Sequence, residues 1–200
     1  MGTEKQATEV RQEQIAQAAL DLVGKQGLKG LSIAGIAERV GIVPSAVYRH
    51  YKGKDDILDA VLALLRNRLM ENVTAVRQET PDALGRLKSL LMRHVRMLAE
   101  NRAIPHVIFS DGMYTGHPER KAKVRDIMHG YLGEVMRIVQ EGQQAGAVRR
   151  EIDPKATSVM FLGMILPAAV LWSVSGGDFD VVAHAKNAWP TFERGIAAGM

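Results

Sequence analysis

The stretch from Leu31 to Lys54, LSIAGIAERVGIVPSAVYRHYKGK, decides how this chain begins to fold. Ser32 is a suitable N-cap, apolar residues spaced three and four apart follow it, and Gly41 stands just past the last of them. This pattern predicts a helix of about two turns with one buried face. A second helix is predicted to begin at Pro44, because the missing N–H of proline costs nothing at the first helical position, and to run to about Tyr51. The residues between Gly41 and Pro44 then form a tight turn.

Two short helices joined by a glycine-containing turn are typical of a helix-turn-helix unit, whose second helix enters the DNA major groove. A helix pair in another all-helical fold has the same pattern, so the charges are needed to separate the two interpretations. From Lys25 to Lys54 there are six basic residues and one acidic residue, a balance of +5, whereas the whole chain carries +4. Because each neutralised phosphate releases condensed counterions, positive charge gathered here favours DNA binding.

Residues 9 to 60 resemble the DNA-binding domain of TetR-family bacterial transcriptional regulators, the tetracycline-repressor-like proteins. The resemblance is carried by spaced positions in LSIAGIAERVGIVPSAVYRHYKGKDDIL: Ile36-Ala37, Gly41, Tyr48, His50-Tyr51, Lys54 and Ile57-Leu58. It implies that Tyr48, His50 and Lys54 hold DNA phosphates, with Ser32 at the start of the other helix.

Two positions depart from the family pattern. Val43 stands where a small polar cap is usual, and Ala46 where threonine is frequent. Both change which side chains reach the bases. Ser45 and Arg49 are then the candidates for contacts to base edges or nearby phosphates, because the arginine fork matches guanine O6 and N7. The predicted DNA-binding set is Ser32, Pro44, Ser45, Tyr48, Arg49, His50 and Lys54.

The composition limits the classes of protein that this chain can be. Its 200 residues are 46% hydrophobic, enough for a sizeable core. It has no cysteine, which excludes disulfides, thiol nucleophiles and Cys-ligated metal centres. The N-terminal MGTEKQATEVRQEQ is polar and lacks the apolar core of a signal peptide, so we expect a cytoplasmic protein.

The rest of the chain predicts an all-α protein, because apolar residues recur at helical spacing and no alternating strand pattern is long enough to trust. Residues 1–8 are expected to be frayed and 103–118 to be broken by proline and glycine. The three helices up to residue 53 form an N-terminal helix-turn-helix bundle (domain 1–53), and the remainder forms a helical ligand-binding and dimerisation domain (54–200). The predicted helices outside the opening stretch are Glu9–Lys25, Lys54–Glu79, Asp82–Arg102, Pro118–Ala145, Pro154–Ser173 and Phe179–Ala198.

The segment Val159 to Val174, VMFLGMILPAAVLWSV, carries no charge. A membrane span is one interpretation, but a bilayer needs about 20 apolar residues, and this run contains Gly163 and Pro167. Burial on several sides is favoured. The resembling family pairs its last two long helices across a four-helix dimer interface, so a homodimer through the last two helices is expected, which suits a palindromic double-stranded DNA operator.

The C-terminal region is also rich in methionine, whose flexible, polarizable side chain suits irregular apolar surfaces. Eight of the ten methionines lie between Met70 and Met164. This favours a pocket for a small apolar effector, although plain core filling explains any one of them equally well. The predicted lining residues are Phe109, Met113, Tyr131, Phe161, Met164 and Trp172, with Asp111 and His117 as polar candidates.

Nothing in the sequence supports catalysis or a cofactor. The histidines have no metal-ligand spacing, no phosphate-binding loop is present, and no nucleophile and base can be paired. Two functions therefore remain open. The first is a ligand-responsive homodimeric repressor that an apolar effector releases from its operator, and the second is a constitutive DNA-binding or protein-interaction module without an inducer. The methionine-rich interior favours the first.

Overall fold

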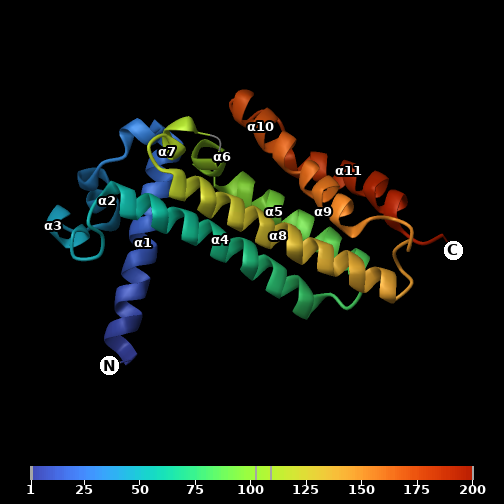
Figure 1. Ribbon diagram of the computed structural model, residues 1–200. Coiled ribbons are helices and arrows are strands. Elements are labelled where there is room, and N and C mark those ends of the chain that lie inside the picture. Colours follow the sequence, from blue (N-terminus) through green and yellow to red (C-terminus); the bar gives the residue numbers. More distant parts are fainter. Residues whose placement is uncertain (1, 102, 109, 200) are drawn as a thin grey trace. The chain divides into compact units, whose positions relative to one another are not determined.

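The chain folds into helices, and the described residues, 2–101, 103–108 and 110–199 of the computed structural model, contain no strand (Figure 1). They form two compact units, residues 1–67 with 101–124 and residues 68–100 with 125–200. The all-α class, with an N-terminal helix-turn-helix and a helical C-terminal region, is confirmed. The division into domains 1–53 and 54–200 stays a prediction.

The first unit is built around the opening stretch of the sequence. α1 packs against α2, η1 and α6, and α2 packs against α3. Its fully buried apolar side chains include Ile15, Leu20, Ile36, Val47 and Ile57. The unit contains α1 (Gly2–Gln26), η1 (Leu28–Gly30), α2 (Ile33–Val40), α3 (Pro44–Val47), the start of α4 (Lys54–Glu79), α6 (Ala103–Ile108), α7 (Asp111–Tyr114) and the start of α8 (Pro118–Gln144).

The second unit contains the remainders of α4 and α8 together with α5 (Ala83–Glu100), α9 (Pro154–Gly163), α10 (Leu166–Val174) and α11 (Val181–Ile196). α5 packs against α11. Glu141 of α8 accepts hydrogen bonds from Arg77 of α4 at 2.8 Å and from Arg86 of α5 at 2.9 Å, so one carboxylate joins three helices. The pKa of Arg77 is raised, chiefly by its hydrogen bond to Glu141.

Two predicted helix bounds in the first unit are wrong. α1 begins at Gly2 instead of Glu9, because residues 4–7 are good helix formers with no proline to stop them. α3 ends at Val47 instead of Tyr51. Beyond it, the N–H groups of Arg49 and His50 each bond to a carbonyl only three residues back, at 3.3 and 3.0 Å, so the chain tightens into turns.

The helix predicted over Pro154–Ser173 is two helices, α9 and α10, with a break at Met164 and Ile165. Pro167 has no N–H to donate to the carbonyl of Gly163, which is where α9 ends. By length and composition the segment 154–174 would also suit a membrane span. Its buried side chains instead form part of the core of the second unit: Phe161, Leu162, Ile165, Ala168, Ala169 and Trp172.

Candidate functional site

The helix-turn-helix is set by three local features. The Ser32 hydroxyl oxygen accepts the N–H of Gly35 at 3.1 Å and caps α2, as predicted. Gly41 ends α2 with φ +72°, a left-handed conformation that favours glycine, and the N–H of Ile42 bonds to the carbonyl of Ala37 at 2.9 Å. α3 then begins at Pro44.

The segment from Pro44 to Lys54 is held from inside by Val47 and Tyr51 and leaves most of its polar side chains in solvent. Val47 is fully buried, whereas Tyr48 is 57% exposed. The hydroxyl of Tyr51 donates to the carbonyl of Gln12 in α1 at 3.1 Å, and burial raises its pKa. Among the predicted DNA-binding residues, exposed positions are Pro44, Ser45, Tyr48, Arg49 and Lys54, and half-buried positions are Ser32 and His50. Their assignment to DNA stays a prediction.

A charged cluster holds the start of α4, where Lys54 lies, against the start of α8. Arg120 is 2% exposed and donates to Asp55 at 2.6 Å and to Asp59 at 3.2 Å. Lys123 pairs with the other oxygen of Asp59 at 2.7 Å. The hydrogen bond from Arg120 lowers the pKa of Asp55. This cluster, named here the Arg120 clamp, pairs two of the carboxylates that follow Lys54, Asp55 and Asp59, with cations of α8.

The predicted effector-lining residues are spread over both units. Met113 is fully buried in the first unit, and Phe109 lies outside the described residues. In the second unit, Tyr131, Phe161 and Trp172 are buried, and Met164 lies between α9 and α10. Of the set, Met164 lines the pocket described in the next paragraph, and the set as a whole stays a prediction.

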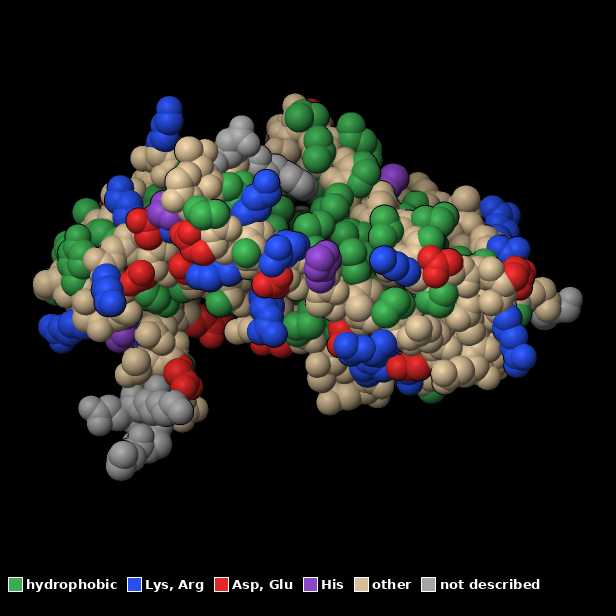
Figure 2. All heavy atoms as spheres, viewed as in Figure 1, with side chains coloured by type: hydrophobic (Ala, Val, Ile, Leu, Met, Phe, Trp, Pro, Cys, Tyr) green, Lys and Arg blue, Asp and Glu red, His purple; other side chains and the backbone are tan. Residues whose placement is uncertain are grey.

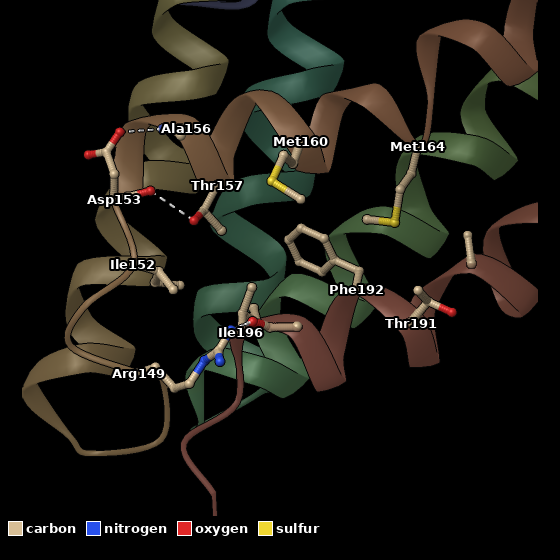
Figure 3. A pocket seen from close by; sticks show the side chains of 12 residues that line it. Arg149, Ile152, Asp153, Ala156, Thr157, Met160, Met164, Thr191, Phe192 and Ile196 are labelled. Atoms are coloured by element: carbon tan, nitrogen blue, oxygen red, sulfur yellow. Dashed lines mark hydrogen bonds between the residues drawn. The ribbon is translucent and has the colours of Figure 1, made fainter.

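A pocket of about 700 Å³ opens in the second unit between α9, α11 and the segment that precedes α9. In Figure 3, Met160 and Met164 point toward the ring of Phe192, and Arg149 lies at the other end beside Ile196. Phe192 in turn lies 5.9 Å from the ring of Phe161. Pockets of this volume with mostly apolar walls accept drug-sized ligands.

The second unit also contains a buried polar pair that the sequence interpretation missed. Nδ1 of His94 on α5 and the hydroxyl of Tyr131 on α8 are 3.0 Å apart, and the side chains are 6% and 2% exposed. Burial lowers the pKa of His94 to about 4 and raises that of Tyr131, so both are neutral at pH 7. The available signal was the position of His94 on the apolar face of its helix, in register with Leu87, Leu90, Leu91, Val95 and Leu98.

An uncharged, exposed hydrophobic face runs along α9 and α10. Val174 is 77% exposed and Met160 is 62% exposed. In Figure 2, hydrophobic side chains gather over α10. The exposed members of this face, named here the α9–α10 face, are Val159, Met160, Val170, Leu171 and Val174. Exposed apolar patches of this kind mark interaction surfaces. Within the described ranges, no group of three or more metal-ligating side chains is present.

Two family models match the chain. The model described as "Bacterial regulatory proteins, tetR family" matches residues 15–61, which contain the helix-turn-helix. The model described as "YsiA-like protein, C-terminal region" matches residues 65–194, more than half of the chain.

Individual proteins agree with the family models. The fatty acid metabolism regulator protein of Bacillus subtilis is 23% identical over 183 residues, which cover 92% of this chain and 94% of that protein. The HTH-type transcriptional regulator TtgR of Pseudomonas putida is 29% identical over 194 residues, covering 92% and 90%. The solved structure of the regulator FadR from Bacillus subtilis in complex with stearoyl-CoA aligns with a TM-score of 0.76 at 22% identity, covering 92% of this chain and 98% of that one. That likeness shows a shared fold.

Proposed function

Since this chain belongs to the tetR family of bacterial regulatory proteins, and is therefore a ligand-responsive DNA-binding transcriptional regulator and not an enzyme, we propose how its own residues perform that function. It acts in the cytoplasm as a homodimeric repressor. Each subunit places α3 in the major groove of one half of a palindromic operator, and an apolar effector in the second unit releases the DNA. A constitutive module without an inducer is not favoured.

The observation that carries DNA binding is the exposed basic segment that follows α2. Tyr48, Arg49 and Lys54 are exposed together at the end of the stretch from Lys25 to Lys54, whose balance is +5. We assign phosphate contacts to Tyr48, His50, Lys54 and Ser32, and base-edge contacts to Ser45 and Arg49, with Pro44 fixing the start of the helix. Helix-turn-helix proteins bind in this way.

We propose a fatty-acyl thioester, or a molecule of similar apolar shape, as the effector. Two matches from the same organism, Bacillus subtilis, support this class: a protein named a fatty acid metabolism regulator, and the structure of FadR solved with stearoyl-CoA. The second unit has matching chemistry, because Met164 and Phe192 line its pocket with a thioether and an aromatic group. Of the lining residues predicted from the sequence, Met164 belongs to this pocket. The others remain proposed effector contacts: Phe109, Met113, Tyr131, Phe161 and Trp172.

We propose that the α9–α10 face, together with α11, forms the homodimer interface. An uncharged apolar surface is what a self-complementary two-fold contact needs, and dimerisation is typical of the family. The dimer presents two copies of α3 and so roughly doubles the specific free energy of binding relative to one subunit.

The test begins with selection of bound duplexes from a random DNA library, followed by fluorescence anisotropy at fixed salt. His50→Ala and Lys54→Ala should each weaken binding about tenfold, and Lys54→Ala, which removes a full positive charge, should also flatten the salt dependence. Lys121→Ala, which removes an exposed cation elsewhere in the first unit, is the matched control.

Stearoyl-CoA should release the wild-type protein, and free coenzyme A should not. Unchanged affinity in both variants would refute the assigned contacts, and retention of DNA with acyl thioesters of every chain length would refute the effector class.

A further inference from the structure

Two exposed hydrophobic side chains lie on the DNA-reading segment. In the described part of the first unit, large hydrophobic side chains with more than half of their surface exposed are Val10 at 51%, Tyr48 at 57% and Val43 at 60%. Tyr48 has a hydroxyl that can donate to a phosphate, so its exposure is explained by the proposed function. Val43 has no polar group, and its exposure needs another explanation.

Val43 does not stabilise the start of α3 with a side-chain cap. It is the N-cap residue of α3, and its side chain makes no capping hydrogen bond. Serine, threonine, asparagine or aspartate would cap the helix there and stabilise it, whereas valine is among the poorest N-caps. A residue that caps poorly and leaves most of its surface in water suits a role in contacting a partner.

The charge of the surroundings identifies that partner as DNA. Val43 lies in the stretch from Lys25 to Lys54, which has a balance of +5, and Arg49, Lys52 and Lys54 follow it by six, nine and eleven residues. Such a surface attracts a polyanion and does not favour an uncharged protein surface. On the base edges of the major groove, the apolar group is the C5 methyl of thymine, and aliphatic side chains contact it.

We propose that Val43 is a specificity-determining residue, and that its methyl groups pack against the C5 methyl of a thymine in each operator half-site. The inference rests on the proposed DNA-binding function and deepens it by naming one base. It also assigns a role to the position at which the sequence departs from the family's polar cap. Ser45 and Arg49, both exposed on the same short segment, remain free to contact polar base edges.

The experiment replaces thymines of the selected operator one at a time with uracil, which lacks only the C5 methyl group. For the wild-type protein, one position in each half-site should lose about fourfold in affinity, the effect expected for one methyl group removed from contact. For Val43→Ala, the same replacement should change affinity by less than about 1.5-fold, because the partner of that methyl is already gone. Val43→Thr keeps one methyl group and should retain part of the sensitivity.

The matched control is Val10→Ala, which shortens an exposed valine of the same unit on α1 and should leave the uracil profile unchanged. Thermal melting of each variant reports whether it is folded. Uracil sensitivity that persists in Val43→Ala, a wild-type profile without any sensitive thymine, or a selected half-site with no fixed A·T pair would each refute the role of Val43 while DNA binding stands. Failure to select any duplex would refute the proposed DNA-binding function as well.

Discussion

Both units expose hydrophobic side chains, but these lie in a basic stretch in the first unit and in an uncharged stretch in the second. In the first unit, Val43 and Tyr48 lie in a stretch with a balance of +5. In the second unit, the α9–α10 face lies within residues 159–174, which carry no charge. Exposure alone therefore does not identify a partner. Positive charge beside apolar groups suits a nucleic acid, whereas the absence of charge suits another protein surface.

The buried polar groups of the two units differ as well. The second unit buries neutral groups that hydrogen-bond to each other or to backbone: His94 with Tyr131, and Thr157 and Ser158 with carbonyls of the preceding turn. The first unit buries a full charge, Arg120, held by two carboxylates. Substitutions in each unit test these differences.

The largest expected effect comes from placing charge on the α9–α10 face. Leu171→Glu combined with Val174→Glu puts four carboxylates into each proposed dimer interface, where they lose water and repel each other. We expect the dimer dissociation constant, measured by sedimentation velocity, to rise on the order of 1,000-fold. Gln144→Glu adds a charge to an exposed position of α8 and should have no effect. A double variant that sediments as the wild type does would place the dimer contact elsewhere.

The Arg120 clamp should show a smaller and asymmetric effect. Asp55→Asn combined with Asp59→Asn leaves a buried guanidinium without a counter-charge, and we expect a loss of about 3 kcal/mol in unfolding free energy. Arg120→Met removes the buried charge and leaves two carboxylates that water can reach, so we expect a loss below about 1 kcal/mol.

Urea unfolding of the two clamp variants measures this asymmetry at one pH. Equal losses would mean that Arg120 is better solvated than its 2% exposure indicates. The double variant should also lose part of the acid sensitivity of the wild type. The pKa of Asp55 is lowered in the folded protein, so its contribution is present above the unfolded pKa and is lost as pH falls through the folded value.

The sequence predicted features that depend on neighbouring residues, and it did not predict contacts between distant ones. Ser32, Gly41 and Pro44 act within one or two turns of chain, so their roles could be read from spacing alone. The Arg120–Asp55 and His94–Tyr131 pairs join residues 65 and 37 positions apart, and no local pattern marks which polar groups will meet.

The break between α9 and α10 was only partly predictable from the sequence. The sequence shows that Pro167 leaves the carbonyl of Gly163, four residues back, without its helical donor. Whether a helix ends at such a carbonyl, as α9 does, or continues through its proline, as α11 does at Pro190, required the structure. Val43 was recognised as unusual from the sequence, and its 60% exposure, which supports its proposed role, required the structure.

The buried His94 should give the second unit a pH dependence of intermediate size. Its pKa is about 4 in the folded protein and near 6.5 when unfolded, so the unfolded chain binds the proton more tightly. This contribution is fully present above pH 6.5 and is lost as pH falls toward 4. Between pH 7 and pH 5 the wild type should lose about 2 kcal/mol more than His94→Gln. Parallel pH profiles for the two proteins would show that His94 is protonated without cost in the folded state.

The smallest expected effect tests whether the first unit depends on its local signals as strongly as the sequence implies. Ser32→Ala removes the oxygen that accepts the N–H of Gly35, and we expect a loss of about 1 kcal/mol in unfolding free energy. Ser32→Asp keeps an acceptor at the helix start and should restore stability, but it places a negative charge near the proposed phosphate contacts. If Ser32 contacts a phosphate as proposed, the Asp variant should therefore be stable and bind DNA weakly, whereas the Ala variant should be less stable and lose part of its affinity. Urea unfolding and anisotropy on the same samples separate these two roles, and full DNA affinity in Ser32→Asp would limit Ser32 to capping.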